Sequence, residues 1–321
     1  MHRVALDARD AYTTPLRGTG RYALELTHAL PPGLMSIHRR GGPGPEVLWE
    51  QVGLPRALRR ERAGAVHAPN CFLPLRRPCP GVVTIHDLAF EAFPNDFSRR
   101  TGAKYRYFTP RAARSAERVI CVSRATADDV VVRYGVREDK LRVIPNAPSL
   151  PIGDAPAGDG GSPYLLAVGD LRAKKNLGRL ISAWQRSGVP HRLVLAGQGT
   201  MAVPGGVELT GFVDDARLDA LMRGAALVVH PSLYEGFGLV VVEAMARGTP
   251  VAIADATALP EVAGDAAERF DPLDADDMAA AILRALARSG ELRELGRARV
   301  ASLSWAGTAA ATADVYRELL G

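Results

Sequence analysis

Short apolar runs alternate along the chain with stretches in which apolar and polar positions repeat at helical spacing. The short runs predict strands, and the longer stretches predict helices. Their regular alternation predicts strand–helix–strand units, and therefore an α/β fold built from doubly wound parallel sheets. The predicted strands are Val4–Asp7, Leu34–His38, Ala65–His67, Val82–His86, Val119–Val122, Leu141–Ile144, Tyr164–Val168, Leu193–Ala196, Val207–Thr210, Leu227–His230 and Val251–Ala254.

Two such domains are expected in a chain of 321 residues. The segment Pro148–Pro163 is dense in Pro, Gly and Asp and predicts a linker between them. We therefore expect one domain over 1–150 and another over 151–304, with the carboxyl ends of both sheets facing a deep cleft. Helices are expected at about residues 20–30, 99–117, 123–134, 176–187, 214–223, 238–247 and 274–288.

Charge is distributed unevenly between the two halves. Residues 1–150 carry 24 Lys and Arg against 14 Asp and Glu, a net charge of +10, whereas residues 151–321 carry 16 against 21, a net charge of −5. A basic half can attract nucleic acid, an anionic membrane surface or a phosphorylated substrate. No nucleic-acid motif and no aromatic residues interleaved with the basic ones are present, so no nucleic-acid partner is expected. A plain solvated Arg-rich surface remains the alternative.

Targeting and metal signals are weak. The apolar run Val4–Leu6 after the first three residues is too short for the core of a signal peptide, and no run reaches the roughly 18 apolar residues of a membrane span. Cys71, Cys79 and Cys121 have neither an even count nor zinc spacing, so we expect neither disulfides nor a structural metal. The expected compartment is the cytoplasm, with possible peripheral membrane contact through the basic half.

The segment His230–Gly248 carries the strongest chemical signal. A strand ends at His230, and a turn at Glu235–Gly238 then leads into a helix, whose first amides and positive dipole end suit an anionic diphosphate. Glu243 lies eight residues after Glu235, about 12 Å along a fully helical path. That separation disfavours a glycosidase pair, whose carboxylates lie about 5–9.5 Å apart. The alternative, a helix-capping Glu235 and an exposed Glu243, is weakened by the apolar neighbours of Glu243.

A basic cluster and a glycine pair mark two further strand-to-helix turns. Arg172, Lys174 and Lys175 form a candidate phosphate clamp, since cations at a helix start are otherwise unfavourable. Gly18 and Gly20 form a weak G-x-G signal that also fits a plain turn. The third glycine and the downstream acid of a dinucleotide fingerprint are absent, which argues against a dehydrogenase.

Taken together, these motifs resemble retaining glycosyltransferase family 4, whose members have the GT-B fold of two Rossmann-like domains. The resemblance spans nearly the whole chain. It rests on Glu235–Leu239 with Glu243, His230–Ser232, Arg247–Val251, Leu259–Ala267, Gly169–Leu177, Gly211–Asp215, Arg17–Tyr22, Thr84–Leu88, Val143–Asn146, and a last helix over about 305–321 that passes Tyr316 and is expected to pack on the N-terminal domain.

This resemblance implies a nucleotide-sugar donor in the C-terminal domain. Glu243 is expected to bind the ribose, Lys175 the diphosphate, and Glu235 the donor sugar. Asp170 stands where the family often has an arginine, so either Arg172 or Lys174 could accompany Lys175. Further donor contacts are expected from Gly236, Phe237, Gly238 and Leu239 in the glutamate turn, and from Phe212 and Val213 beside the nucleobase.

In the N-terminal, acceptor-side domain, the resemblance implies roles for the loop of Gly18 and Gly20 and for His86. The loop would approach the donor phosphate or the acceptor, and His86 would lie close to the donor sugar. Arg21 could contact an anionic acceptor or form a surface salt bridge. His67 and Asn70 are interpreted as structural.

The implied reaction transfers a hexose-type sugar, with retained configuration and no divalent metal, to a glycan, lipid-linked or small-molecule acceptor. The one Asp-x-Asp sequence, Asp274 to Asp276, is interpreted as a helix start, so no metal-binding motif of this kind is left. Because no protein nucleophile stands out, we expect front-face displacement. UDP, GDP and dTDP all remain possible in the donor. The alternatives are a nucleotide-sugar epimerase of the same fold and a non-catalytic sugar-nucleotide binder.

Overall fold

The computed structural model describes residues 3–14, 16–31, 35–38 and 45–321, with the backbone alone for 35–38. The chain forms two compact units. The N-terminal unit contains Met1–Asn146 and Ser304–Gly321, and the C-terminal unit contains Ala147–Leu303. The chain therefore passes into the second unit after Asn146, four residues before the expected boundary, and returns to the first at Ser304.

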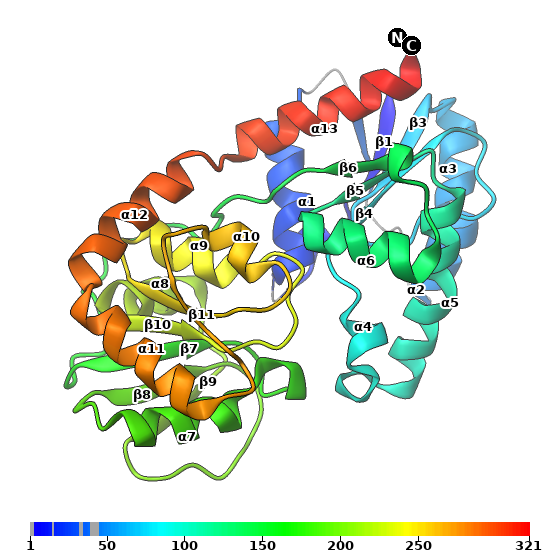
Figure 1. The fold of residues 1–321 in the computed structure, drawn as a ribbon. Coiled ribbons are helices and arrows are strands. Elements are labelled where there is room, and N and C mark those ends of the chain that lie inside the picture. Colours follow the sequence, from blue (N-terminus) through cyan, green and yellow to red (C-terminus); the bar gives the residue numbers. More distant parts are fainter. Residues whose placement is uncertain (1–2, 15, 32–34, 39–44) are drawn as a thin grey trace. The chain divides into compact units, whose positions relative to one another are not determined.

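The described residues of the N-terminal unit contain a six-stranded parallel sheet with the order β2-β1-β3-β4-β5-β6 (Figure 1). Because β2 lies on one side of β1 and the later strands lie on the other, the chain reverses its direction of winding between β1 and β3. Ligands of doubly wound sheets bind at such a switch point, outside the carboxyl ends of the strands. The strands are β1 (Val4–Asp7), β2 (Met35–His38), β3 (Ala65–Ala68), β4 (Gly81–Ile85), β5 (Arg118–Cys121) and β6 (Leu141–Val143).

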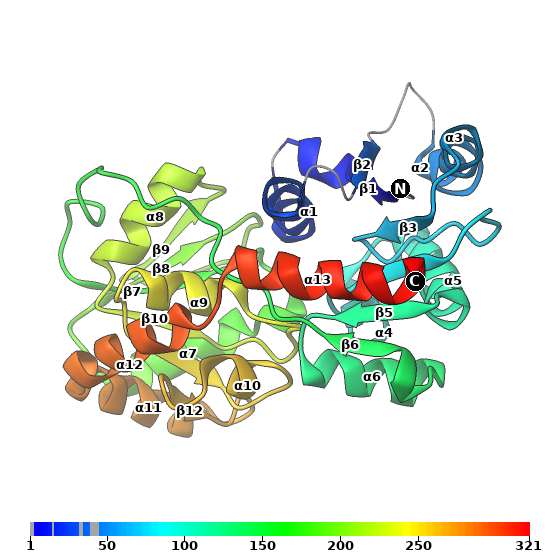
Figure 2. The same cartoon turned by 90° about the horizontal axis from the view of Figure 1, so that it is seen from above.

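Helices cover both faces of this sheet, and alternate strand residues contribute to the two cores. One core joins Val4 and Leu6 to α1 and α13, and the other joins Ala5 to α3, α5 and α6. Figure 2 shows α13 lying along the sheet, where the Tyr316 hydroxyl lies 2.6 Å from Nδ1 of His67. The helices are α1 (Gly18–Ala29), α2 (Glu46–Leu48), α3 (Leu54–Glu61), α4 (Ala89–Ala92), α5 (Arg99–Ser115), α6 (Arg124–Tyr134) and α13 (Trp305–Leu320).

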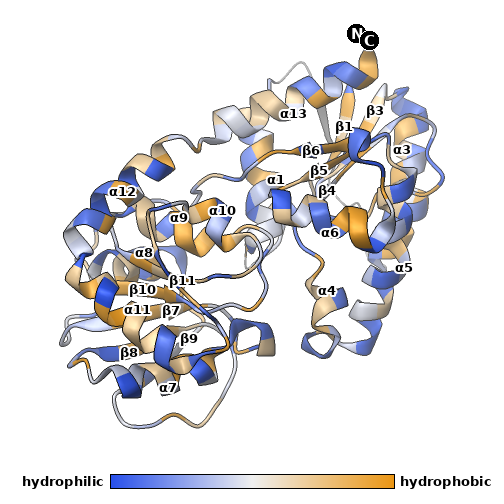
Figure 3. Ribbon diagram, in the orientation of Figure 1, coloured by the Kyte–Doolittle hydropathy of each residue, from blue (hydrophilic) through white to orange (hydrophobic). Residues whose placement is uncertain are grey.

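The described C-terminal unit contains a second six-stranded parallel sheet, with the order β12-β11-β10-β7-β8-β9. Counted from β7, this is the 3-2-1-4-5-6 order of dinucleotide-binding domains, and its switch point lies between β7 and β10. In Figure 3 strands such as β10 are coloured as hydrophobic, as expected for a sheet buried on both faces. The strands are β7 (Tyr164–Val168), β8 (Arg192–Ala196), β9 (Val207–Gly211), β10 (Leu227–His230), β11 (Val251–Ala254) and β12 (Glu268–Phe270).

Around this second sheet, α7 and α11 pack against each other, α9 packs on β10 and β11, and α12 packs against α9. The helices are α7 (Leu177–Ser187), α8 (Asp215–Gly224), α9 (Leu239–Ala246), α10 (Leu259–Ala263), α11 (Ala275–Ala287) and α12 (Ser289–Ala301). Both units are thus doubly wound parallel α/β domains, and the predicted fold class is confirmed.

The predicted strands lie within one residue of the observed ends, although Leu34 lies outside the described residues. The sequence interpretation missed β12 and α12, and also α2, α3, α4 and α10. The strand β12 is short and begins with the charged pair Glu268 and Arg269. In α12, Leu292 and Gly296 are the buried residues, so the helix lacks the repeated apolar face that periodicity detects.

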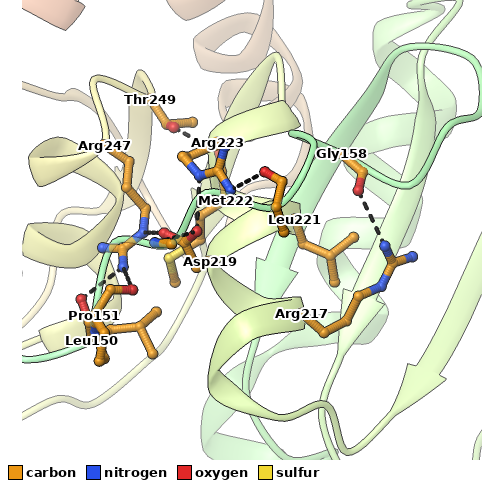
Figure 4. Close-up of polar contacts among 12 residues, drawn as sticks. Leu150, Pro151, Gly158, Arg217, Asp219, Leu221, Met222, Arg223, Arg247 and Thr249 are labelled. Carbon is orange, nitrogen blue, oxygen red and sulfur yellow. Dashed lines mark hydrogen bonds and ion pairs between the residues drawn. The ribbon is translucent and has the colours of Figure 1, made fainter.

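The segment Pro148–Pro163, predicted as the linker between the two domains, begins just after the chain passes into the C-terminal unit and is counted within that unit. Its carbonyl groups accept hydrogen bonds from arginines of the C-terminal unit (Figure 4). Arg247 Nη2 donates to the carbonyl of Leu150 at 2.8 Å, and Arg217 Nη1 donates to that of Gly158 at 3.1 Å. The composition signalled irregular backbone correctly, but side chains far away in sequence hold that backbone against the domain.

Candidate functional site

The strongest candidate site lies at the switch point of the C-terminal unit. The loop Gly169–Asn176 follows β7, and the loop Pro231–Gly238 follows β10. Because β7 and β10 are neighbours in the sheet, both loops leave the same edge side by side. They are also joined directly, since Leu233 N donates to the carbonyl of Lys174 at 2.8 Å, and Asn176 Nδ2 donates to that of Pro231 at 3.2 Å.

These loops bring Glu235 together with two lysines and a histidine. Lys175 Nζ donates to Glu235 Oε1 at 2.6 Å, and Lys174 Nζ lies 3.9 Å from Oε2. His230 Nε2 lies 3.2 Å from Oε1. A carboxylate only accepts hydrogen bonds, so this histidine nitrogen carries the proton. The backbone N–H of Glu235 donates to Thr257 Oγ1 at 2.9 Å, which holds the turn in place.

The electrostatics of the cluster keep Glu235 ionised. Burial raises the pKa of this carboxyl, but the charges of Lys175 and Lys174 and the hydrogen bond from His230 outweigh it, and its pKa lies well below the usual range. Burial lowers the pKa of His230, so its imidazole is neutral near pH 7. Two ammonium groups, one carboxylate and a neutral imidazole leave one net positive charge. This cluster can therefore attract an anion while offering a carboxylate to hydroxyl donors.

Two glycines allow these close approaches. Gly169 has a φ of 150°, and a Cβ atom there would lie 2.8 Å from Cε of Lys175. Gly238 caps α9 in the left-handed region at a φ of 96°, and a Cβ there would lie 2.7 Å from a methyl of Leu259. Side chains other than hydrogen would therefore displace Lys175 or the helix start.

The lysine that accompanies Lys175 at Glu235 is Lys174. The side chain of Arg172 instead lies 3.6 Å from Asp170 and is 39% exposed. Arg172 borders a surface depression of about 920 Å³ next to the start of α7. The loop Glu235–Gly238 is largely buried, with Gly236, Phe237 and Gly238 buried and Leu239 opening α9. Leu239, one residue later than predicted, is therefore the true helix start.

Glu243 is buried, and one of its carboxylate oxygens, Oε1, already accepts two backbone hydrogen bonds. Its Oε1 accepts the backbone N–H groups of Ser149 at 2.6 Å and Leu150 at 2.8 Å, and its Oε2 accepts from Arg247 Nη1 at 2.9 Å. Arg247 also pairs with Asp219 at 2.8 Å (Figure 4), and both of these side chains are completely buried. A carboxylate oxygen accepts about two hydrogen bonds, so Oε2 keeps capacity for a ligand hydroxyl. The sequence indicated a partner for this charge but not its identity.

Phe212 and Val213 follow β9, two strands from β7 on the side away from Glu235. Phe212 is 54% exposed, and Val213 is half-buried. An exposed aromatic ring at the carboxyl end of a strand offers a flat apolar surface to a ligand.

In the N-terminal unit, Gly18 begins α1 and is exposed, whereas Gly20 is buried. A Cβ at Gly20 would lie 2.5 Å from the carbonyl oxygen of Asp10, so this glycine lets α1 pack closely on the segment that follows β1. Arg21 is half-buried in the same helix. The close packing of α1 on this segment is therefore sufficient to require glycine at position 20.

His86 follows β4, and its Nε2 donates to the carbonyl of Pro69 at 2.8 Å. Burial lowers the pKa of His86, although the Pro69 carbonyl and Asp87 raise it, so the ring is neutral near pH 7. The rings of His86 and Tyr22 pack in a T-shaped arrangement, with centroids 4.7 Å apart. With Nε2 donating, Nδ1 is the acceptor of this ring.

His67 is a core residue, since its two ring nitrogens contact Tyr316 at 2.6 Å and Thr84 at 2.8 Å. Asn70, interpreted as structural, is buried and donates to Asp10, and it also borders a pocket at the switch point of its own sheet. His230 and Thr257, which surround Glu235, were not assigned roles from sequence. The position of His230 at the end of a predicted strand was the available signal.

Over the described ranges, no group of three or more His, Cys, Asp and Glu residues could hold a metal ion. The three cysteines are free thiols. In the part of the chain that the structure describes, no helix combines the length and hydrophobicity needed to cross a membrane.

Comparisons with known proteins identify the family. The family model described as glycosyl transferases group 1 matches residues 154–299, and the one described as glycosyltransferase family 4 matches residues 20–148. The O-antigen chain mannosyltransferase B of Escherichia coli is 29% identical over 298 residues, covering 82% of this chain and 76% of that protein. The MMP alpha-(1->4)-mannosyltransferase of Mycolicibacterium hassiacum is 32% identical over 235 residues, covering 65% of this chain and 56% of the relative.

Solved structures share the fold. Sucrose-phosphate synthase from Thermosynechococcus elongatus has a TM-score of 0.75 at 21% identity, with 99% of each chain covered. Anabaena HepE in complex with UDP and glucose has a TM-score of 0.69 at 18% identity, again with 99% of each chain covered. The two doubly wound units share the GT-B fold of these structures, and the family matches identify a glycosyltransferase, an enzyme that transfers a sugar. The chain belongs to the glycosyltransferase group 1 and family 4 proteins.

Proposed function

We propose that this enzyme transfers a hexose-type sugar from a nucleoside diphosphate sugar to a hydroxyl of a glycan, a glycolipid or a small metabolite. The observation that carries the proposal is the cluster of Lys174, Lys175 and Glu235 at the switch point. Its net positive charge lies where the α9 amides begin, which suits a diphosphate. The ionised carboxylate next to it suits the hydroxyls of a sugar.

The donor would extend along the carboxyl edge of the sheet. Glu235 follows β10 and Phe212 follows β9, with β7 and β8 in between. Three strand spacings of about 4.8 Å separate the two ends by about 14 Å, a distance suited to an extended nucleotide sugar. In this arrangement the sugar contacts Glu235, Lys175 binds the diphosphate, and Phe212 with Val213 borders the nucleobase. Glu243 would accept a ribose hydroxyl through Oε2.

The reaction proposed is a front-face displacement with retained configuration. The bond from the anomeric carbon to the diphosphate oxygen breaks, and a bond to the acceptor oxygen forms on the same face. The acceptor proton passes to the departing phosphate oxygen. Lys175 and Lys174 stabilise the negative charge that develops on the diphosphate, in the role that a metal ion fills in other transferases. Because Glu235 stays ionised, it orients the sugar and does not donate a proton.

Mannose is the first sugar to test, because relatives from two bacteria are named as mannosyltransferases. A solved neighbour was captured with UDP-glucose, so UDP donors belong in the same panel as GDP and dTDP donors. The experiment incubates each donor with a panel of glycan and glycoside acceptors and follows the anomeric configuration of the product by NMR. An inverted product would contradict the proposed mechanism, and activity abolished by EDTA and restored by a divalent cation would contradict metal independence.

The same assay separates the two alternatives. A nucleotide-sugar epimerase would convert the donor without an acceptor, whereas a transferase releases nucleoside diphosphate in proportion to the glycosylated acceptor. Binding of a nucleoside diphosphate without any turnover across the acceptor panel would favour a non-catalytic binder.

We also propose peripheral contact with the cytoplasmic face of a membrane. The helix α5 contains no Asp or Glu and exposes Arg99, Arg100, Arg106, Arg111 and Arg114. Five exposed cations on one helix provide a surface that anionic lipids can attract.

A further inference from the structure

A second pocket lies at the switch point of the N-terminal sheet. Asp10 and Arg17 follow β1, Asn70 follows β3, and together with Tyr105 of α5 they border a pocket of about 210 Å³. We infer that this pocket binds one neutral sugar unit of the acceptor and discriminates against phosphorylated acceptors. The inference rests on the proposed transferase function. The volume is below the roughly 300–1,000 Å³ typical of drug-sized ligands and suits a single ring.

The clearest sign of a missing ligand is the side-chain carbonyl of Asn70. Asn70 is 6% exposed, and its Nδ2 donates to Asp10 Oδ2 at 2.7 Å. Since a carboxylate only accepts, this contact determines the orientation of the amide. Among the residues that the structure describes, Oδ1 of Asn70 is buried and has no hydrogen-bond partner. A hydroxyl group in the pocket would supply the missing donor.

The charge of Arg9, which also borders the pocket, is already compensated. Its Nη1 lies 2.8 Å from Glu50 Oε1, and its Nε lies 3.7 Å from both Asp7 Oδ2 and Asp10 Oδ1. The side chain of Arg9 is 5% exposed, and those of Asp7 and Glu50 are completely buried. A guanidinium with three carboxylates within 4 Å has its charge compensated, although its Nη1 makes no well-aligned hydrogen bond among the described residues, and little electrostatic attraction is left for a phosphate.

The other nearby cation is compensated in the same way. Lys104 Nζ donates to Glu50 at 2.8 Å and to Glu46 at 3.0 Å. With Arg17 included, three cations stand against the four carboxylates Asp7, Asp10, Glu46 and Glu50 in the described residues at the pocket. If Asp7 were protonated, the net charge of these seven groups would rise only from −1 to zero. A phosphate dianion would therefore meet no excess positive charge from the described residues, whereas sugar hydroxyls can donate to Asp10, Glu46 and Asn70.

An aromatic ring completes the pocket. Tyr105 borders it and packs edge-on against Phe72, with ring centroids 4.7 Å apart. Lys104 Nζ lies 4.1 Å from the centroid of the Phe72 ring and so stabilises the position of this ring beside Tyr105. One apolar ring face among a few convergent polar groups is the usual composition of a small-molecule site. It matches the combination of C–H and O–H groups on a pyranose.

The test is saturation-transfer NMR without donor. The probes are the methyl α-glycosides of mannose, glucose, galactose and rhamnose, together with mannose 6-phosphate and glucose 6-phosphate, at low salt. We expect at least one neutral glycoside to bind, its signal to fall at least fivefold in Asn70→Ala and in the isosteric Asp10→Asn, and neither phosphate ester to bind better than its neutral parent. The control is Asp129→Asn, which removes a half-buried carboxylate of α6 that pairs with Arg133, and it should leave the signal unchanged.

Three results would overturn the inference: no binding of any glycoside, signals that survive both pocket variants, or phosphate esters that bind at least tenfold more tightly. Thermal unfolding checks that the variants fold. If Asn70→Ala does not fold, Asp10→Asn alone still tests the inference. A thermal-shift panel with UDP, GDP and dTDP on the same samples reports on the C-terminal unit. Nucleotide binding without glycoside binding would refute this pocket alone, and glycoside binding without nucleotide binding would refute the proposed donor site alone.

Discussion

Lys175 Nζ lies 2.6 Å from Glu235 Oε1, although 60 residues separate the two along the chain. Both side chains are mostly buried, at 16% and 12% exposure. Neighbouring strands of one sheet bring their loops together, so that a cation and an anion lie side by side at the switch point. The proposed function assigns the cation to the diphosphate and the anion to the sugar of the donor. This pair is therefore the first target for mutation.

Replacing Lys175 by Met should lower kcat by about 100-fold or more, the usual cost of losing one group that stabilises developing charge. Lys174→Met should cost less, because Nζ of Lys174 lies 3.9 Å from Glu235 and not in hydrogen-bond contact. Steady-state transfer kinetics measure both variants. Arg186→Met, which removes an exposed arginine paired with Asp276, is the control. Equal effects of Lys175→Met and the control would exclude the assigned role.

Glu235→Gln should keep the shape of the site and lose its charge. The amide cannot pair with both lysines, so nucleoside diphosphate should bind at least as tightly while kcat falls. The opposite pattern, weaker nucleotide binding with normal kcat, would mean that Glu235 acts on the nucleotide and not on the sugar. Isothermal titration with the diphosphate and transfer kinetics distinguish the two patterns.

Arg247→Met should destabilise the fold more than it affects chemistry. The side chain of Arg247 is completely buried, and its loss would leave Asp219 and Glu243 with fewer partners and release the carbonyls of Leu150 and Pro151. Breaking a buried ion pair typically costs about 3–5 kcal/mol. Urea unfolding measures the change, and Arg293→Met on the exposed face of α12 is the matched control. A loss below about 1 kcal/mol would show that water replaces these contacts.

Glu243 provides a separate test of the ribose role. Glu243→Gln keeps one acceptor oxygen but replaces the other with an NH2 group and removes the charge. It should therefore accept a ribose hydroxyl less well and weaken nucleoside diphosphate binding. Ribose binding predicts that the loss is smaller for a 2′,3′-dideoxy nucleotide than for the ribonucleotide. Equal losses for both nucleotides would assign Glu243 to holding Ser149 and Leu150 alone.

Acid should destabilise the N-terminal unit through His67. Burial lowers the pKa of His67 to about 3, whereas an unfolded histidine titrates near pH 6.5. Between these values the unfolded chain binds the extra proton, so the stability is complete above about pH 6.5 and is lost as the pH falls toward 3. One proton gives a slope of up to about 1.4 kcal/mol per pH unit. The difference between wild type and His67→Gln, followed by urea unfolding from pH 7.5 to 4.5, isolates this residue from His86 and His230.

Vesicle binding tests the basic face of α5. Binding to anionic vesicles should fall as salt increases, and Arg99→Glu with Arg100→Glu should weaken it at least tenfold. The paired control reverses Arg293 and Arg297 on α12, where both side chains are also exposed. Absence of binding at low salt would exclude the membrane contact. Equal losses in both double variants would show that binding depends on the net charge of the protein and not on the position of the arginines on α5.

Periodicity and turn chemistry are local properties, and they were sufficient to predict the alternating fold, most strand positions and the glutamate turn. Elements without an apolar repeat, such as α12 and β12, could not be detected in this way. The roles assigned to the site residues remain predictions, because they depend on a bound donor and acceptor.

The sequence by itself determined that two doubly wound domains form, since alternating apolar runs can be buried only in covered parallel sheets. Only the tertiary structure decided strand order, and with it the switch points that bring Lys174, Lys175 and Glu235 together in one unit and Asp10 and Asn70 in the other. It also decided that Glu243 and Arg247 hold the segment after Ala147. These pairings join residues far apart in sequence, and their energies depend on burial and distance, which no local pattern encodes.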